Sequence, residues 1–377
     1  MLVSARAWSW LAAASLVLSF HPGPALAERP SLRDPTDGAF DLSAVLDTAY
    51  GFVPIVSPIT EPAVGYGAAG ALVFIDRNSP DEGRPVRPNI AAVGGLATEN
   101  GTSGLFGGHV GHWQGGRLRT VAALADADVN LEYFGLGERT PGAESGLDYT
   151  IGASGGVLGA SYRPWSAPVW IGARYVLAET DVRLRDDPLE DLVDPADQSL
   201  RLAALAATVT FDSRDNSFTP TRGVYFDAAM PWFRDGFGSD RDFELLDVSA
   251  QYFHPLGDRL FGGVRAGWRD SSDGTPFYLR PYVAMRGVQA MRYQGEEVAE
   301  AEAELRWQWR PRWSAVAFAG VGSASTEAGD DETVTAGGGG FQYSIARTYG
   351  LHIGLDVAWG PDDPVLYVVF GSAWLRP

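Results

Sequence analysis

The stretch EVAEAEAELRWQWR (297–310) decides the fold class, because apolar and polar residues alternate in it without a break from Ala299 to Arg310. Alanine and glutamate favour helices, but a helix would scatter the charged residues round its whole circumference. In a β-strand, successive side chains point to opposite faces, so the glutamates share one face while Leu305, Trp307 and Trp309 share the other. We therefore expect a strand with one face in water and the other against an apolar phase.

The same alternation recurs along most of the chain, and it is compatible with two kinds of β protein. A soluble β-sandwich and a membrane-spanning barrel both contain strands of this type. Sixteen segments read as strands: 50–58, 64–75, 88–98, 103–113, 117–133, 148–163, 168–183, 200–212, 223–234, 242–254, 259–270, 298–310, 312–323, 334–347, 350–359 and 365–375.

The connections between these segments separate the two alternatives. The short turns are 114–117, 163–168, 254–259, 310–312 and 347–350, and the long links are 134–148, 183–198 and 271–296. An even strand number with short turns at one end and long loops at the other is the layout of an outer-membrane barrel, whereas a sandwich does not sort its loops in this way. The sequence therefore predicts an all-β fold, a transmembrane antiparallel β-barrel of sixteen strands whose charged residues line a wet lumen.

Composition excludes several classes of function. The chain has no cysteine and no lysine, and its net charge of -18 argues against nucleic-acid binding. No run of residues approaches the roughly 18 apolar positions that a membrane-spanning helix needs. With five histidines and no nucleophile-elbow or phosphate-loop motif, we expect no enzymatic activity, no cofactor and no metal site.

The N-terminus has the features of a secretory signal. Arg6 supplies positive charge, residues 10–20 form a short apolar core, and Ala25-Leu26-Ala27 is a small-x-small cleavage site. We expect residues 1–27 to be removed, residues 28–49 to form a short N-terminal periplasmic segment, and residues 50–377 to form the barrel. A cleaved signal without a membrane helix predicts localisation in the bacterial outer membrane.

Three stretches resemble the BamA/TamA superfamily of outer-membrane barrels, also called the bacterial surface antigen family. FDSRDNSFTPTRGVYFD (211–227) is similar to a hairpin motif of that family. MRGVQAMRYQG (285–295), followed by AELRW (303–307), is similar to its lumen-folded loop and the next strand, and residues 346–374 are similar to its last two strands. The resemblance spans most of residues 50 to 375 and implies that a long loop folds into the lumen.

The resemblance also implies how that loop is held. The loop arginine of the family matches Arg286, which Gly287 follows, and it pairs with carboxylates of the barrel wall; a planar guanidinium suits such pairing. Gly320 stands where family members usually have an aspartate, so Glu304 is the expected partner and Glu302 the second choice. Without the resemblance, an arginine in a solvated loop would be the simpler interpretation.

Two further sets of residues follow from the resemblance. The hairpin motif comprises Asp212, Arg214, Asp215, Asn216, Pro220 and Gly223. These residue types form turns, which favours a structural role, although Asp212 and Arg214 share a face and are placed to join a charge network in the lumen. Near the C-terminus, Gly371 and Trp374 match the closing strand at the seam between the first and last strands, where glycine would soften the strand.

Two acidic stretches are interpreted more simply. The acids of DADVN (126–130) are expected to line the lumen rather than bind calcium, because Leu131 stands where a calcium loop needs glycine. The acidic loop that contains residues 186–197 is expected to be a solvated loop.

The resemblance implies a protein that assists protein or lipid insertion or translocation at the outer membrane. Only residues 28–49 precede the barrel, so we expect it to act without POTRA domains of its own, with a periplasmic partner in that role. Outer-membrane lipid and lipopolysaccharide are the other expected partners. A porin-like passive or gated diffusion channel is the alternative function, and a structural surface protein is a third.

Overall fold

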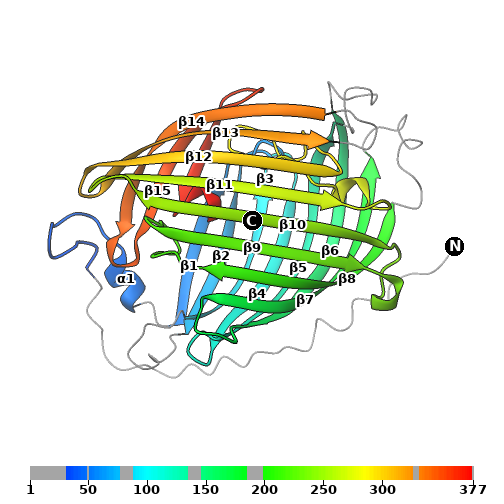
Figure 1. Ribbon diagram of the computed structural model, residues 1–377, viewed down its shortest axis with the longest axis horizontal. Coiled ribbons are helices and arrows are strands. Elements are labelled where there is room, and N and C mark those ends of the chain that lie inside the picture. Colours follow the sequence, from blue (N-terminus) through cyan, green and yellow to red (C-terminus); the bar gives the residue numbers. More distant parts are fainter. Residues whose placement is uncertain are drawn as a thin grey trace.

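The computed structural model describes residues 31–48, 51–76, 88–134, 146–184, 198–325 and 331–375, and it is a β-barrel (Figure 1). The predicted signal peptide and residues 186–197 lie outside the described residues. In this described part of the chain, sixteen antiparallel strands form one sheet in the order of the chain, so the predicted fold class and strand number are confirmed. No helix in the described part of the chain is long and apolar enough to cross a membrane.

The strands follow one another with few other elements between them. They are β1 (Gly51–Ile59), β2 (Gly67–Asp76), β3 (Asn89–Thr98), β4 (Ser103–Trp113), β5 (Leu118–Tyr133), β6 (Leu147–Tyr162), β7 (Val169–Leu184), β8 (Ser199–Asp212), β9 (Gly223–Phe233), β10 (Phe243–Pro255), β11 (Leu260–Ser271), β12 (Glu297–Arg310), β13 (Trp313–Ser325), β14 (Asp331–Ala346), β15 (Leu351–Trp359) and β16 (Val365–Phe370). The helical elements in the described residues are α1 (Ser43–Thr48) and the 3-10 turns η3 (Asp235–Phe237), η4 (Phe277–Leu279), η5 (Arg347–Tyr349) and η6 (Ala373–Leu375).

Strand β12 has the two faces that its sequence predicts. Its even-numbered residues from Glu300 to Arg306 point into the barrel, where Glu300 and Glu302 are buried. On the opposite face, Leu305 is 48 % exposed and Trp307 is 55 % exposed. Apolar side chains with this exposure, in a strand paired on both sides, form the belt that an outer-membrane barrel turns toward lipid.

At the ends of β5 to β8 farthest from α1, the two faces of the sheet have the opposite polarity to those of β12. There the inner face is apolar: Tyr149, Val182 and Leu202 pack against Tyr278 of η4, which lies inside the barrel. Asp128 therefore faces outward, where it pairs with Arg183 at 2.6 Å, both side chains being more than half exposed.

The prediction that the acids of residues 126–130 line the lumen is consequently wrong. These positions belong to a part of the sheet that packs as a soluble protein does, with its apolar side inward.

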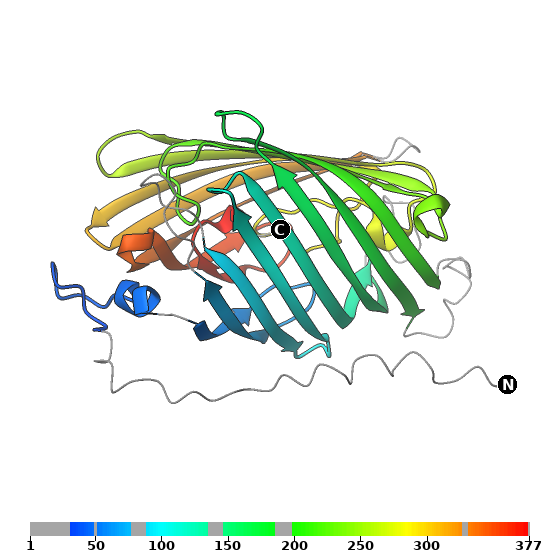
Figure 2. The same ribbon diagram turned by 90° about the horizontal axis from the view of Figure 1, so that it is seen from below.

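The two ends of the barrel differ. The segment 31–48 with α1 lies at the end with the short turns, which we call the α1 end, and the connection between β11 and β12 lies at the other, which we call the loop end (Figure 2). Among the described residues, no ladder joins β1 to β16. We call this junction the seam. Its two strands differ in length, nine residues in β1 and six in β16.

Candidate functional site

The loop between β11 and β12 (residues 272–296, hereafter the lumen loop) lies inside the barrel. Its backbone is folded back on itself, with the amide of Val283 donating to the carbonyl of Tyr293 at 2.9 Å. Val283, Met285 and Val288 form an apolar cluster with side chains of the neighbouring wall, Val298, Ala324 and Val334. The lumen loop is therefore packed against β12 to β14 and is not a loop surrounded by solvent.

Arg286 is the centre of the lumen loop's polar contacts. Its Nη2 lies 2.6 Å from Glu302 and 2.7 Å from Glu304, and its Nη1 lies 2.8 Å from Asp356. Only 4 % of its side chain is exposed. The structure thus brings Arg286 together with both glutamates named from the sequence, and β15 supplies a third carboxylate. We call these four residues the Arg286 cluster.

Two aromatic side chains complete the surroundings of Arg286. The guanidinium carbon lies 3.5 Å from the centre of the Phe318 ring, a distance typical of a cation–π contact. The indole Nε1 of Trp374 donates a hydrogen bond to the same Glu302 oxygen that Arg286 contacts. Sequence reasoning missed Asp356, Phe318 and Trp374 as members of the site. The one available signal was that His352 and Asp356 share a polar face within an otherwise apolar strand.

Two further arginines, Arg265 and Arg269, neutralise Glu300, another inward-facing carboxylate of β12. Glu300 contacts Arg269 at 2.9 Å and Arg265 at 3.2 Å, and it accepts a hydrogen bond from the amide of Ala284 at 2.6 Å. Because Ala284 belongs to the lumen loop, this carboxylate also holds the loop. Arg286 and Glu300 together give the loop a polar attachment on each side of Met285.

Gly287 lies where a side chain would not fit. Its φ of +86° is in the left-handed region, and an added Cβ would lie 3.2 Å from the carbonyl oxygen of Trp359. Its amide donates to the hydroxyl of Tyr367 in β16 at 3.1 Å. The lumen loop therefore contacts the last strand directly.

The lumen loop also reaches the connections on both sides of the seam. The amide of Ala290 donates to Glu61, between β1 and β2, at 3.4 Å. Arg292 pairs with Asp362, between β15 and β16, at 3.2 Å. One loop thus contacts the first and the last hairpin of the sheet.

The hairpin motif forms the connection between β8 and β9. Arg214 Nε pairs with Asp212 at 2.9 Å, and both side chains are buried. Asp215 accepts the amides of Thr221 and Arg222. These contacts fit the structural role that its residue types predict.

The motif is also joined to other parts of the barrel. Asn216 donates to the carbonyl of Tyr349 in η5 at 2.9 Å, and the carbonyl of Pro220 accepts from Arg306 at 3.3 Å. Gly223 has a φ of +109°, and a Cβ there would lie 2.5 Å from the carbonyl oxygen of Ser213. The motif holds its turn against β12 and the β14–β15 connection.

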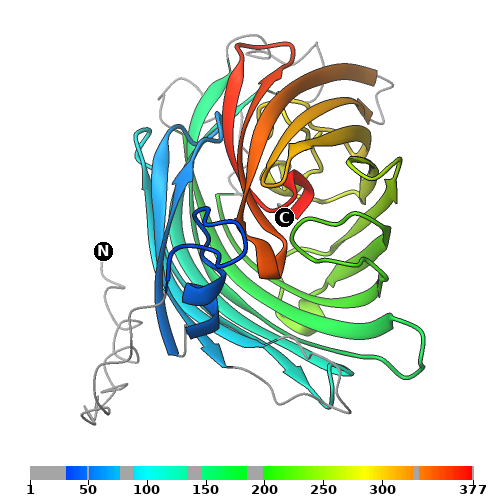
Figure 3. The same cartoon turned by 90° about the vertical axis from the view of Figure 1, so that its left-hand side faces the viewer.

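Gly371 and Trp374 are not part of the closing strand, which corrects their sequence-based placement. β16 ends at Phe370, and Gly371, with a φ of +74°, turns the chain away from the sheet. Trp374 lies in η6 inside the barrel (red in Figure 3), buried against Phe253 and Glu302. Glycine at 371 therefore permits a turn and does not soften a strand.

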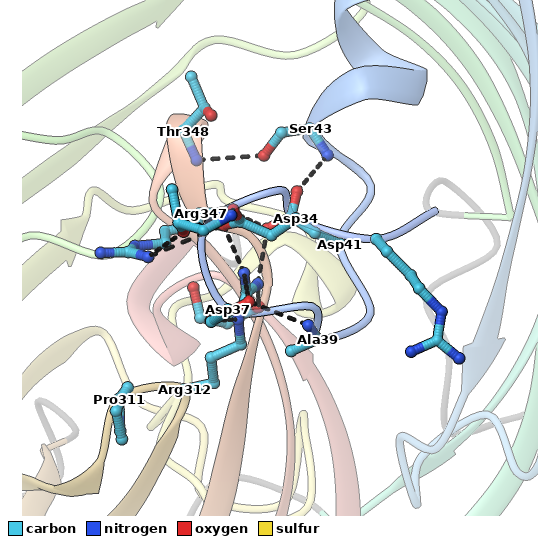
Figure 4. A network of polar contacts seen from close by, with 12 residues as sticks. Asp34, Asp37, Ala39, Asp41, Ser43, Pro311, Arg312, Arg347 and Thr348 are labelled. Carbon is cyan, nitrogen blue, oxygen red and sulfur yellow. Dashed lines mark hydrogen bonds and ion pairs between the residues drawn. The ribbon is translucent and has the colours of Figure 1, made fainter. Parts of the chain in front are cut away.

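A second arginine-centred cluster lies at the α1 end. Arg312 contacts Asp34 at 2.6 Å, Asp37 at 2.7 Å and Asp41 at 2.6 Å (Figure 4). We call these four residues the Arg312 cluster. It attaches the segment 31–48, which precedes β1, to the connection between β12 and β13.

The connection between β14 and β15 adds to this attachment, because the amide of Thr348 donates to Ser43 Oγ at 3.1 Å. Sequence reasoning did not foresee the cluster; the available signal was three aspartates within residues 34–41.

The aspartates of the Arg312 cluster are held in their charged form. Burial alone would raise the pKa of Asp41, but hydrogen bonds from Ser43 and Arg312 outweigh it and lower the pKa to about 2. A hydrogen bond from Arg312 likewise lowers the pKa of Asp37. Within the described residues, no group of His, Asp and Glu has the arrangement of a metal site.

Comparison with known proteins adds a family and a fold. The Omp85 superfamily domain matches residues 127–361. BamA from Haemophilus ducreyi lacking POTRA domains 1-3 is similar in structure, with a TM-score of 0.57 and 11 % identity over 90 % of this chain and 80 % of that one. No curated protein matches the chain.

Two CdiB structures are also similar. CdiB from Escherichia coli has a TM-score of 0.57 and 14 % identity over 84 % of this chain and 61 % of that one. CdiB from Acinetobacter baumannii has a TM-score of 0.53 and 11 % identity over 85 % and 59 %. The chain thus spans about three fifths of the CdiB chains. At these identities, the likeness shows the shared barrel fold.

We expect Arg286→Ala to release the lumen loop, because removing one partner of a buried ion pair leaves the other uncompensated and costs about 3–5 kcal/mol. Limited proteolysis in intact cells, with cleavage mapped to residues 272–296, measures the release. Arg292→Ala is the matched control: its ion pair in the same loop is more exposed, 28 % at the arginine against 4 % for Arg286, and ion pairs that water reaches contribute less. Equal protection of the wild type and Arg286→Ala would contradict the assigned role.

Acidification should detach the segment 31–48. The pKa of Asp41 is lowered from 3.8 to about 2 on folding, so its contribution is complete above pH 3.8 and is lost as the pH falls toward 2. Pepsin cleavage within residues 31–48 should therefore increase between pH 4 and pH 2. Asp41→Asn should make the segment accessible to a neutral protease at pH 7. Constant protection in both experiments would refute this attachment.

Proposed function

This chain belongs to the Omp85 superfamily, and from that membership we propose that it assists the insertion or translocation of proteins or lipids at the outer membrane. In this proposal the α1 end faces the periplasm, and the loop end faces the outside of the cell. Residues 1–27 are a cleaved signal peptide. Lipid and lipopolysaccharide surround the outer belt, and a periplasmic partner delivers clients to the α1 end.

The observation that carries the proposal is the arrangement around the seam. β1 and β16 form no ladder with each other in the described residues, so each has a backbone edge available for pairing with another strand. The lumen loop contacts Glu61 and Asp362, beside the first and last hairpins. The segment 31–48 leads into β1 and is held by Arg312, in the connection between β12 and β13. Both attachments span the seam.

The mechanism uses strand pairing at the seam. A client strand that adds to β1 gains main-chain hydrogen bonds, and pockets for alternate side chains supply selectivity. Among the described residues, β1 and β16 form no ladder with each other. This missing ladder, and not a glycine within β16, makes the seam the weakest junction of the sheet.

A gated diffusion channel is the second candidate, and a cavity beside the lumen loop favours it. This cavity of about 540 Å³ is lined by Arg174, Asp227, Asp247 and Arg269, among others. Rings of charged side chains set ion preference in pores. In this alternative the lumen loop gates the channel, and β1 and β16 do not separate during function.

Joining the seam covalently should abolish assisted insertion. Val56 in β1 is 73 % exposed and Leu366 in β16 is 43 % exposed, both on the outer face, and the chain contains no cysteine. We expect proteoliposomes of the Val56→Cys, Leu366→Cys variant to accelerate insertion of an unfolded eight-stranded barrel protein. After treatment with a bifunctional maleimide, the rate should fall to that of empty liposomes.

The matched control joins strands that are already paired. Val56 lies opposite Gly70 across the β1–β2 ladder, so the Val56→Cys, Gly70→Cys variant should keep its activity after the same treatment. Full activity with the seam joined would refute the seam mechanism. Absence of any acceleration by the uncrosslinked protein would refute the insertase proposal and favour the channel.

A further inference from the structure

The inner wall of the barrel has a polar half and an apolar half, which differs from the wet lumen lined by charged residues that the sequence predicts. The inward face of β7 is identified by Thr180, whose hydroxyl lies 2.7 Å from that of Tyr278 in the lumen loop. Counting back by twos along β7 gives Ala178, Val176 and then Arg174. The pairing of residues between neighbouring strands then identifies the inward-facing residues of β6, β5, β4 and β3. The wall of β3 to β7 that faces the lumen is built almost wholly from small and apolar residues.

This apolar wall contains a hollow. It has a volume of about 530 Å³, within the range of sites that hold one small ligand. The inward side chains that line it include Ile90, Phe106, Val110, Val121, Ala123 and Val176. Val110 is 43 % exposed and Ile90 is 38 % exposed. Figure 3 looks into the barrel from the α1 end, with this wall in cyan and green facing β11 to β13 in yellow and orange.

Arginines border the apolar hollow on one side. A second hollow of about 240 Å³ shares Val110 and Val121 with the first and is lined by three arginines, Arg119, Arg174 and Arg214, and two aspartates, Asp212 and Asp227. Arg214 is paired with Asp212. Arg119 is stacked on Trp170, with its guanidinium carbon 3.4 Å from the ring centre. The side chain of Arg174 is exposed to the lumen and forms no ion pair with a described residue. An apolar hollow next to guanidinium groups is complementary to a molecule with a hydrocarbon chain and an anionic head.

We propose that the apolar wall of β3 to β7 binds an anionic phospholipid, with an acyl chain in the hollow and its phosphate near Arg174. Guanidinium groups bind phosphate through charge-assisted hydrogen bonds. The volume of the hollow is that of a site for one small ligand, which favours a phospholipid chain over the many chains of a larger glycolipid. The proposal goes beyond the proposed function, because a lipid in the lumen is compatible with insertion, translocation or conductance.

A polypeptide client suits this wall less well than a lipid. Every strand from β3 to β7 is paired on both sides, so the wall presents side chains and no free backbone edge. An extended peptide laid across it would remove its own amides and carbonyls from water without new partners, which is costly. A hydrocarbon chain has no such groups.

The seam provides a route for the lipid. Ile55 in β1 is 48 % exposed. It lies opposite Ala71 of β2, which in turn lies opposite Gly94 of β3, so the three residues face the same side of the sheet. These inward positions are apolar or lack a side chain, and they run from the seam to the hollow. An acyl chain that passes between β1 and β16 therefore meets an apolar surface throughout.

Fluorescence quenching in bilayers tests the proposal, because the chain has no cysteine and each single-cysteine variant carries one label. Ala123→Cys places a bimane label in the hollow, and Ala122→Cys places it one residue away on the lipid-facing side. Ser249→Cys places it on the polar wall of β10. With phosphatidylglycerol brominated on its acyl chains, we expect quenching at positions 122 and 123 and none at 249.

The role of Arg174 is tested in the same system. Adding Arg174→Gln to the Ala123→Cys variant should raise the mole fraction of brominated phosphatidylglycerol needed for half-quenching about tenfold, the effect of one charge-assisted hydrogen bond. Brominated phosphatidylcholine should show little change. If the label at position 123 is not quenched, like the label at position 249, the proposal is overturned. So would a label at 123 that responds only to an added apolar β-strand peptide, since the hollow would then hold a polypeptide.

Discussion

The burial of the Arg286 guanidinium among Glu302, Glu304 and Asp356 is the interaction on which the arrangement of the lumen depends. Taking a guanidinium out of water costs several kcal/mol unless carboxylates and hydrogen bonds compensate it. Here the compensating groups lie on β12 and β15, with β13 and β14 between them in the sheet. The arginine therefore fixes the lumen loop against strands that do not touch each other. Phe318 and Trp374 exclude water from the same site and strengthen its electrostatics.

The Arg312 cluster repeats this chemistry at the α1 end with a different purpose. Each cluster contains one arginine and three carboxylates, but the Arg286 cluster attaches a loop within the lumen, while the Arg312 cluster attaches the segment that leads into β1. Both lie on the β12–β15 side of the seam and hold elements that reach the β1 side. The edge of β1 is therefore restrained through side chains at two levels of the barrel, in place of a backbone ladder to β16. Such contacts break and form again more easily than a continuous ladder, which suits a junction that opens.

The sequence predicted the fold well, because a strand can be recognised from the alternation of neighbouring residues alone. Alternation in β12 and the length of each connection are properties of neighbouring residues, and they predicted sixteen strands. The lumen loop was predicted from the family resemblance. The partners of Arg286 on β12 were accessible through the family resemblance. Asp356 was not, because its contact depends on the register across three ladders. The outward direction of Asp128 and the apolar lumen wall were also inaccessible, since alternation shows that two faces differ but not which one faces inward.

Single-channel conductance of the refolded protein in planar bilayers, with the wild type beside Arg286→Ala, tests the central claim most directly. If the Arg286 cluster holds the lumen loop across the lumen, the wild type will be quiet and the variant will conduct with frequent fluctuations. A steady open pore of equal conductance in both proteins would contradict the account. It would show that the buried cluster does not control the lumen and that the protein is a diffusion channel.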